Sequence, residues 1–242
     1  PRFAELFTLA AIAAAPLDLA LIDGLLLHSF ALSAWKQQGD ARWSLRVNPS
    51  SGNLHPTEAY LLAPAIAGLG DAPGLHHYSP LLHGLERRRD LSPLLWSALT
   101  AGLPQPCLLV GLATIAWREA WKYGERGFRY CQHDLGHAIA ALDIAAAMVG
   151  WRALELPRPD DAELATLLGL GHDSGPEPEV PEALLVLVPT SVDVAAIRGW
   201  TISADALAAL ARLPLHGAAN RLSVAHQPWP VIDEVTRATR RS

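Results

Sequence analysis

The chain of 242 residues is poor in charge, because only 18% of its residues are Asp, Glu, Lys or Arg, and its formal net charge is −5. That balance, together with the lack of any basic stripe, argues against a nucleic-acid partner. Lysine occurs only twice, as Lys36 and Lys122, so arginine carries most of the positive charge. The paired cysteine spacings of a zinc site are also missing.

Cysteine is scarce as well, and its two copies exclude the disulfide framework of a small secreted protein. Cys107 stands in an apolar run that predicts a buried strand, and Cys131 stands in a helical stretch. A reducing cytoplasm is therefore the expected compartment. Residues 3–15 are apolar and follow Arg2, as in a signal peptide, but the run is too short to span a bilayer and Asp18 interrupts it. We expect no membrane segment.

The sequence is rich in apolar residues, which make up half of the chain and predict a substantial core. Apolar periodicity and capping residues predict helices over residues 17–38, 91–101, 115–123, 128–150, 160–170 and 203–212. Short apolar runs predict strands over residues 58–63, 75–79, 84–88, 107–113, 151–156 and 183–188. The second and third of these strands should form a hairpin, and residues 213–242 should form an irregular tail.

The order of these elements indicates an α+β fold, because helices and strands do not alternate strictly and the hairpin adds antiparallel pairing. The helix over residues 128–150 is apolar nearly all round, so we expect it to be buried at the centre. We divide the chain into an N-terminal segment (1–16), a main domain (17–190), and a C-terminal helix with an extended tail (191–242).

Residues 46–60 are the most informative stretch of the chain. A dense polar loop interrupts the apolar sequence there, and its hydrogen-bonding side chains are Asn48, Ser50, Ser51, Asn53 and His55. Gly52 frees the backbone, while Pro49 and Pro56 stiffen it. Ordering such a loop costs conformational entropy, which makes sense if the loop cradles a planar polar ligand. The alternative is an ordinary turn between a helix and a strand.

Three stretches of the chain together resemble the FMN-dependent nitroreductase superfamily. Residues 48–58, NPSSGNLHPTE, are similar to its Pro-Ser-Ser-x-Asn-x-Gln/His-Pro loop, in the His-Pro-x-Glu form of SagB-type dehydrogenases and peptide azoline oxidases. Residues 117–130, WREAWKYGERGFRY, and then Gly136-His137 resemble the Lys-Tyr-Gly…Arg-Tyr…Gly-His pattern of that group. Residues 74–86 resemble its hairpin, in which a Tyr-His-Tyr-x-Pro strand turns into a His-x-Leu-Glu strand.

This resemblance implies a nitroreductase-like mixed sheet packed with central helices, a bound FMN in residues 17–190, and hydride transfer through flavin N5. A flavin enzyme must hold the isoalloxazine ring, neutralise the phosphate and leave one ring face open. The resemblance assigns cofactor binding to Arg46, Pro49, Ser50, Ser51, Asn53 and His55. The substrate would be a small electrophile or a peptide heterocycle, and NAD(P)H is a candidate reductant.

The pair Lys122-Tyr123 carries the sharpest catalytic hypothesis. In azoline oxidases, an adjacent Lys-Tyr pair in this block acts in removing a proton from the azoline ring. A dry pocket beside a flavin could lower the pKa of Lys122 enough to make it a base, and Tyr123 could donate or relay a proton. The alternative is that Lys122 only solvates the C-terminal end of a short helix, where a cation is favoured.

The flavin phosphate has no evident ligand in the sequence. Family members usually supply an Arg-x-Ser motif before the first long helix, where this chain has Arg2 alone, and the only similar string is residues 240–242, Arg-Arg-Ser. That ending and the missing initiator methionine suggest the N-terminal half of a tandem nitroreductase-like protein. We expect a homodimer, or a pseudo-dimer with a second half, because the family loop contacts flavin across a dimer interface. The alternative function is a non-catalytic half-domain that completes a partner's flavin site.

The histidines offer weaker signals. His133 and His137 lie four residues apart on one helix face, but no second cluster completes a metal site, so we expect no metal. His76, His77 and His83 alternate on the hairpin strands, and we expect them to be surface or packing residues.

Overall fold

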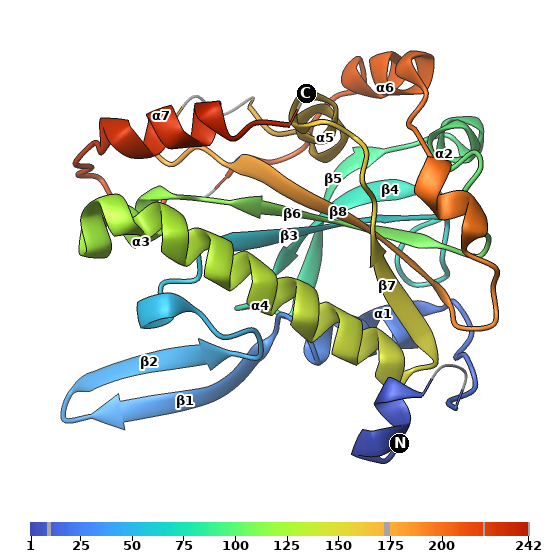
Figure 1. Ribbon diagram of the computed structural model, residues 1–242, viewed down its shortest axis with the longest axis horizontal. Coiled ribbons are helices and arrows are strands. Elements are labelled where there is room, and N and C mark those ends of the chain that lie inside the picture. Colours follow the sequence, from blue (N-terminus) through green and yellow to red (C-terminus); the bar gives the residue numbers. More distant parts are fainter. Residues whose placement is uncertain (9–10, 172–174, 220, 242) are drawn as a thin grey trace.

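A six-stranded sheet forms the centre of the structure, a computed structural model that describes residues 1–8, 11–171, 175–219 and 221–241 (Figure 1). Its strands lie in the order β5-β4-β3-β6-β8-β7, and every described pairing is antiparallel rather than mixed in direction. The strands are β3 (Thr57–Ala63), β4 (Gly74–Ser79), β5 (Gly84–Asp90), β6 (Leu108–Thr114), β7 (Trp151–Glu155) and β8 (Val180–Pro189). The expected α+β class is confirmed.

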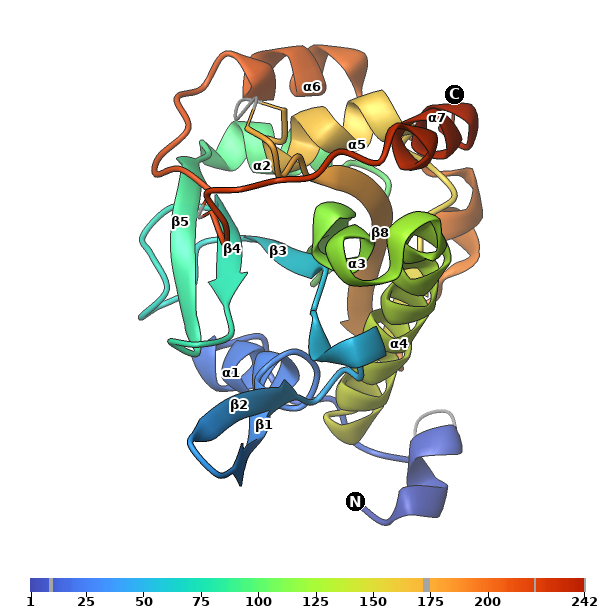
Figure 2. The same ribbon diagram turned by 90° about the vertical axis from the view of Figure 1, so that its left-hand side faces the viewer.

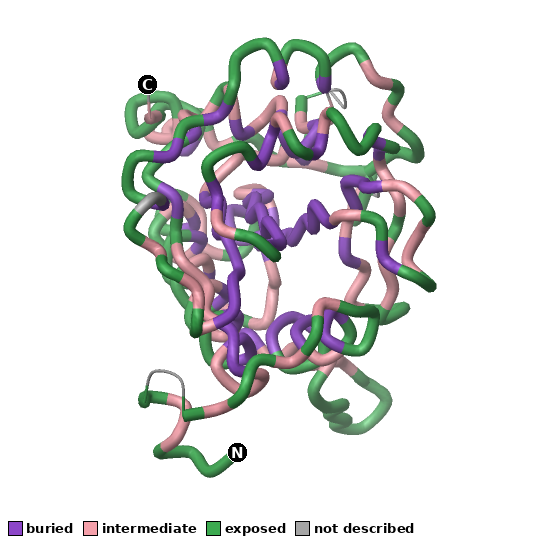
Figure 3. The backbone as a smooth tube through the Cα atoms, turned by 90° about the vertical axis from the view of Figure 1, so that its right-hand side faces the viewer, coloured by how far each residue is buried: buried purple, intermediate pink, exposed green. Residues whose placement is uncertain are grey.

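Helices cover both faces of this sheet (Figure 2). One face carries α1 (Leu19–Leu27) and α4 (Gly127–Met148), and the other carries α2 (Pro93–Leu99), α5 (Asp161–Leu168) and α6 (Ala204–Ala211). Alternate residues of β6 therefore enter different cores, Val110 on the α4 side and Leu109 on the α5 side. Burial on both faces explains why the central strands are continuous apolar runs. These strands are among the buried segments, coloured purple, at the centre of Figure 3.

Local sequence signals fix several of these elements. The Ser92 side chain accepts a hydrogen bond from the Leu95 N–H at the start of α2, with Pro93 in the first turn. Asp160 and Glu163 form a reciprocal capping box at the start of α5. The expected helices over residues 91–101 and 160–170 are confirmed, apart from end residues.

The predicted helix over residues 17–38 is wrong in its second half. Helix α1 ends at Leu27, and β1 (Leu32–Gln38) pairs with β2 (Ala41–Arg46) as an exposed hairpin beside the main sheet. Gly39, with φ of 57°, and Asp40 form its two-residue turn. The helical spacing of residues 17–27 does not extend into the polar, exposed segment that follows.

Two further expectations need correction. Helix α4 buries only one face, and its opposite face, which includes Gly136, Ala140 and Ile144, is exposed in the single chain. The tail expected to be irregular contains α7 (Pro230–Ala238). Pro230 lies in the first turn of that helix, where proline is compatible with helical structure and does not break it. Helix α3 (Trp117–Tyr123) ends at Gly124, as expected.

The N-terminal segment packs on the main domain. Residues Phe3–Phe7 form a short 3-10 helix, the Ala15 N–H donates to the Val149 carbonyl (2.9 Å), and Trp151 Nε1 donates to the Ala15 carbonyl (2.9 Å). Among the described residues, no helix combines the length and the apolar character needed to cross a membrane. The division at residues 16 and 190 stays a prediction.

Candidate functional site

Residues 48–55 leave β2 and enter β3 in a constrained loop conformation. Gly52, Asn53 and His55 all have positive φ, at 62°, 61° and 50°. A Cβ on Gly52 would meet the Tyr123 hydroxyl and Lys122 Nζ and displace them, and the positive φ itself favours glycine there. Positive φ is costly for side chains other than glycine, so the surroundings must hold this loop in place.

Asp134 of α4 holds the first half of the loop. Its buried carboxylate accepts hydrogen bonds from Ser50 Oγ (2.6 Å), the Ser51 N–H (2.9 Å) and Ser51 Oγ (3.1 Å). Glu119 of α3 is fully buried nearby, and burial, followed by the charge of Asp134, raises the pKa of Glu119 to about 8. A proton on Glu119 removes the repulsion between the two carboxyls, which leaves Asp134 free to bind the loop.

Lys122 and Tyr123, at the end of α3, contact the same loop at Gly52. Lys122 Nζ donates to the Gly52 carbonyl (3.5 Å), and the Tyr123 ring packs edge-on against Tyr130, with 4.5 Å between centroids. The structure therefore brings together two sequence motifs that are about seventy residues apart. Lys122 is exposed in the single chain, so the dry pocket that would make it a base requires a further covering group.

His55 offers a hydrogen-bond acceptor at the end of the loop. Asn53 Nδ2 donates to the Ser44 carbonyl (2.8 Å), so Asn53 Oδ1 faces His55 Nε2 (2.8 Å) and that nitrogen carries the proton. Burial, followed by the charges of Arg46 and Arg118, lowers the pKa of His55 to about 3 and keeps the ring neutral at neutral pH. Its Nδ1 is a buried acceptor with no hydrogen-bond partner among the described residues.

A cavity of about 460 Å³ adjoins the loop, the β4–β5 hairpin and the tail residues Ala218, Ala219 and Leu222. Of the predicted site residues, only Arg46 and His55 line it, and Arg46 Nη1 donates to the Thr57 carbonyl (3.4 Å). The predicted residues outside its lining are Pro49, Ser50, Ser51, Asn53, Lys122 and Tyr123. Its charged lining also includes Glu58, Glu86, Arg88, Arg118 and Glu179. The predicted residues thus occupy two neighbouring surfaces, the loop face at Lys122 and the cavity.

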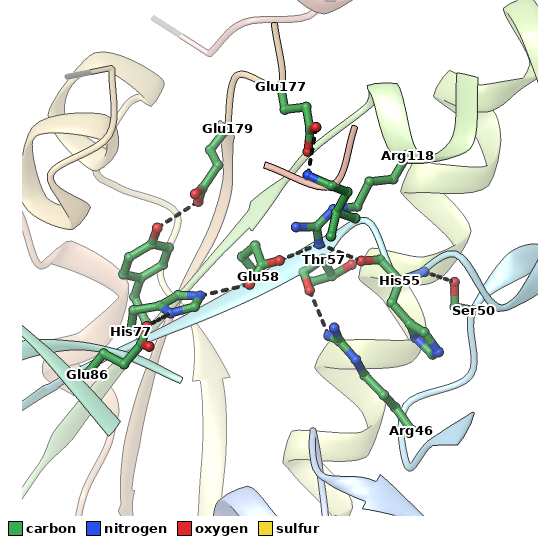
Figure 4. A network of polar contacts seen from close by, with 12 residues as sticks. Arg46, Ser50, His55, Thr57, Glu58, His77, Glu86, Arg118, Glu177 and Glu179 are labelled. Atoms are coloured by element: carbon green, nitrogen blue, oxygen red, sulfur yellow. Dashed lines mark hydrogen bonds and ion pairs between the residues drawn. The ribbon is translucent and has the colours of Figure 1, made fainter. Parts of the chain in front are cut away.

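A charged network that sequence patterns did not predict lies in the cavity wall (Figure 4). His77 Nε2 lies 2.8 Å from Glu58 Oε2, and His77 Nδ1 lies 2.8 Å from Glu86 Oε2. Arg118 Nη1 donates to Glu58 Oε1 and to the His55 carbonyl (2.9 Å for the second). The network joins residues of all three motif stretches.

The expectation that His77 is a surface or packing residue is incomplete, because its ring packs on Tyr60 but also joins this network. Its side chain is only 18% exposed, and both of its ring nitrogens meet carboxylates. A usable signal existed, because the predicted hairpin places His77 directly opposite Glu86. His76 is buried, and His83 lies between Tyr78 and Asp23, with ring nitrogens 2.7 Å from the Tyr78 hydroxyl and 2.8 Å from Asp23 Oδ1.

The network shifts the titration of its own members. Burial alone would raise the pKa of Glu58, but the His77 hydrogen bond and the charge of Arg118 outweigh it and hold that pKa at about 2. Burial alone would lower the pKa of His77, but Glu58 and then Glu86 raise it above 6.5. Glu58 is therefore held as a carboxylate at neutral pH, and the charged form of His77 is favoured.

The C-terminal tail contributes to the same region. Glu177 Oε1 accepts from the Leu222 N–H (2.9 Å) and the Ser223 N–H (3.1 Å) and lies 2.9 Å from His226 Nε2. The His226 ring packs on Trp117 of α3, with 4.4 Å between centroids. The described part of the tail thus packs on its own domain.

The candidate phosphate and metal residues are engaged elsewhere. Arg241 Nε donates to Asp161 Oδ1 (3.2 Å) and its Nη2 to the Glu182 carbonyl (2.7 Å), while Ser242 lies outside the described residues. Arg129 Nε donates to His133 Nε2 (3.2 Å). Within the described ranges, no group of three or more His, Cys, Asp and Glu side chains could hold a metal ion.

Comparison with known proteins identifies the fold. No family model and no curated protein matches the sequence. A presumptive nitroreductase from Anabaena variabilis ATCC 29413 is similar in structure, with a TM-score of 0.60 and 25% identity over 71% of this chain and 35% of that chain. So is the E. coli microcin synthetase McbBCD complex with truncated pro-MccB17 bound, with a TM-score of 0.55 and 23% identity over 74% of this chain and 64% of that chain.

A presumptive nitroreductase from Ralstonia eutropha JMP134 gives a TM-score of 0.56 and 18% identity over 78% of this chain and 83% of that chain. These likenesses show that the chain has a nitroreductase-like α+β fold. The chain spans about a third of the length of the Anabaena protein that it matches.

Proposed function

We propose that this chain is an FMN-dependent oxidoreductase of the nitroreductase superfamily, from the SagB and azoline-oxidase-like branch, working in the cytoplasm. The observation that carries the proposal is the meeting of Lys122 and Tyr123 with the polar loop at Gly52. Two independent parts of the sequence resemblance thus lie side by side on one surface. A fold shared with presumptive nitroreductases and with a synthetase complex supports the same assignment.

The loop has the hydrogen-bonding groups that a flavin ring requires. Asn48 Oδ1 and His55 Nδ1 are buried acceptors with no hydrogen-bond partner among the described residues, and they would accept from the N–H groups of a ring. Ser50 and Ser51 would fix the loop through Asp134 and offer their remaining lone pairs. The other cofactor residues that we propose are Arg46, Pro49 and Asn53. Bound FMN would supply a two-electron acceptor for hydride.

The two catalytic residues would manage the proton that accompanies the hydride. Lys122 would accept a proton from the substrate, and Tyr123 would donate or relay one. The substrate that we propose is a peptide heterocycle or a small electrophile, with NAD(P)H as a candidate reductant. The cavity beside the loop has a volume suited to a small ligand.

A second copy, or a second nitroreductase-like half, would complete the site. Gly136, Ala140 and Ile144 give α4 an exposed face of small and apolar residues, which suits packing against another chain. Such a partner could also cover the exposed Lys122. The Anabaena relative leaves room for a second half, since this chain matches 35% of it.

Substitution of Lys122 tests the catalytic assignment. We expect the assembled Lys122→Ala protein to keep FMN but to lose flavin turnover with substrate by about 100-fold, because general-base catalysis typically contributes that much or more. Arg126→Ala, which removes an exposed cation from the following 3-10 turn, is the control and should react like the wild type. Unchanged turnover in Lys122→Ala would show that Lys122 is not catalytic and only places a charge at the end of α3.

A second candidate is a non-catalytic half-domain that lends the loop to a partner's flavin. The engagement of Arg241 by Asp161 and the Glu182 carbonyl favours it, because the Arg-Arg-Ser string then has one fewer cation for a phosphate. This candidate predicts that the chain retains FMN only when it is mixed with the partner half. Retention by the isolated chain, measured by gel filtration with absorbance detection, would exclude it.

A further inference from the structure

His77 occupies an unusual position, because each of its two ring nitrogens lies 2.8 Å from a carboxylate oxygen. A neutral imidazole has one N–H and one lone pair, so one of these nitrogens would turn its lone pair toward an anionic oxygen. A doubly protonated ring instead donates to both Glu58 and Glu86. The geometry therefore favours an imidazolium, held between strands β3 and β5.

The chain of contacts continues from His77 to the loop (Figure 4). Glu58, which is 8% exposed at its side chain, accepts from His77 on one oxygen and from Arg118 on the other. The same Arg118 nitrogen donates to the His55 carbonyl (2.9 Å). His55 has a φ of 50°, a conformation that persists in a non-glycine residue only when its surroundings fix it.

We propose that His77 is a positioning residue, an imidazolium that aligns Glu58 and Arg118 and thereby fixes His55 at the edge of the cavity. His77 bonds Glu58 and Glu86, and it acts on His55 only indirectly, through Glu58 and then Arg118. Its consequence for cofactor affinity rests on the proposed FMN function, whereas its consequence for the order of the loop does not. Glu86 lies at the surface end of this series of contacts, and its side chain is 56% exposed.

The groups around His77 determine how its protonation, and with it this network of contacts, responds to pH. The groups that face His77 or Glu58 are Tyr60 on β3, Glu86 on β5, Arg46 on β2, Arg118 on α3 and Glu179 before β8. Glu58, Glu86 and Glu179 favour the charged ring, and burial opposes it. Because the pKa of His77 is raised on folding, its contribution is complete below about 6.5 and is lost as pH rises through the higher folded value.

The first measurement is the protonation of His77 by imidazole ¹⁵N chemical shifts in the chain without cofactor. We expect the ring to keep both protons up to a pH above the ordinary histidine value of about 6.5, because Glu58 and Glu86 favour the imidazolium. Glu86→Gln should lower the pH at which the ring loses its proton. A wild-type His77 ring that is already neutral at a pH of about 6.5 would overturn the proposal.

The second measurement is hydrogen exchange at the His55 amide, whose N–H donates to Ser50 Oγ (2.8 Å). We expect His77→Gln to speed this exchange by about ten-fold, because a charged hydrogen bond in the network is lost. The amide of Leu112 in the core strand should be unchanged, which separates local loosening from global unfolding. His83→Gln is the matched control, since His83 lies in this hairpin, bonds the Asp23 carboxylate of α1, and has no hydrogen bond to the loop among the described residues.

These results distinguish the possible failures. If the wild type binds FMN, His77→Gln should weaken binding about ten-fold while His83→Gln leaves it unchanged. If the wild type binds no FMN even when it is assembled with the second copy or half, the proposed function fails, but the ring protonation and the His55 exchange still decide the inference. Wild-type exchange in His77→Gln would make His77 merely structural and overturn the proposal. Should that variant not fold, Glu86→Gln answers the same question, because Glu86 is half-exposed and lies at the end of the chain of contacts.

Discussion

Replacing Asp134 by asparagine tests most sharply how the polar loop is held. The buried carboxylate accepts from Ser50 Oγ, the Ser51 N–H and Ser51 Oγ at 3.1 Å or less. A hydrogen bond to a charged group contributes about 1.5–3 kcal/mol, and a neutral one about 0.5–1.5 kcal/mol. Asparagine keeps one acceptor oxygen, so the two bonds from Ser51 to Oδ1 lose their charged acceptor and the bond from Ser50 Oγ to Oδ2 is lost. We expect the free energy of unfolding to fall by about 2–4 kcal/mol.

One effect opposes this loss, and it is small at neutral pH. Removing the charge of Asp134 also relieves its repulsion of Glu119, but Glu119 is protonated below about pH 8 and carries little charge at pH 7. The relief grows as pH rises through that value. The difference between the wild type and Asp134→Asn should therefore shrink in alkaline solution, where holding two carboxylates together destabilises the wild type more.

Urea unfolding followed by tryptophan fluorescence measures the change. Asp143→Asn is the matched control, because Asp143 lies exposed on the same helix and should change stability by no more than about 0.5 kcal/mol. If Asp134→Asn unfolds within that margin of the wild type at pH 7, Asp134 does not hold the loop and the reasoning is refuted.

Three further predictions concern the loop, the network and the core. Gly52→Ala should destabilise the fold by about 1–3 kcal/mol, because its Cβ meets the Tyr123 hydroxyl and its φ is positive, and an unchanged urea midpoint would contradict this. The lowered pKa of Glu58 adds stability above about 4.5 that is lost as pH falls toward about 2, so Glu58→Gln should flatten stability over that window, as titrated circular dichroism would reveal. Gly111→Ala should cost about 1–3 kcal/mol, because its Cβ would lie 2.3 Å from Leu168 of α5, and a thermal melt equal to the wild type would exclude that close packing.

Most of the fold could be predicted because its signals are local. The continuous apolar run of β6 reflects burial on both faces of the sheet, and Ser92 and Asp160 mark helix starts by capping them. The β1–β2 hairpin escapes prediction because β1 is largely exposed and no residue of β2 is fully buried, so no buried face imposes an apolar alternation. Because packing imposes no pattern on residues 32–38, the helical spacing of residues 17–27 extends the predicted helix too far.

The site divides in the same way. The loop stood out because Gly52 and its polar neighbours interrupt an apolar sequence. The contact between Lys122 and this loop depends on how α3 packs, and no local sequence pattern encodes that packing. The role of His77 depends on two strand pairings at once, to Glu86 across the hairpin and to Glu58 on β3. A predicted hairpin register gives the first contact but not the second.

The central claim is that residues 48–55 hold a flavin against Lys122 and Tyr123. The most direct test is the visible absorption spectrum of the purified chain after gel filtration, with and without added FMN. Our account predicts flavin bands, near about 370 and 450 nm, that elute with the protein. A colourless protein after incubation with excess FMN would contradict a self-sufficient flavin site and favour a half-domain that awaits its partner.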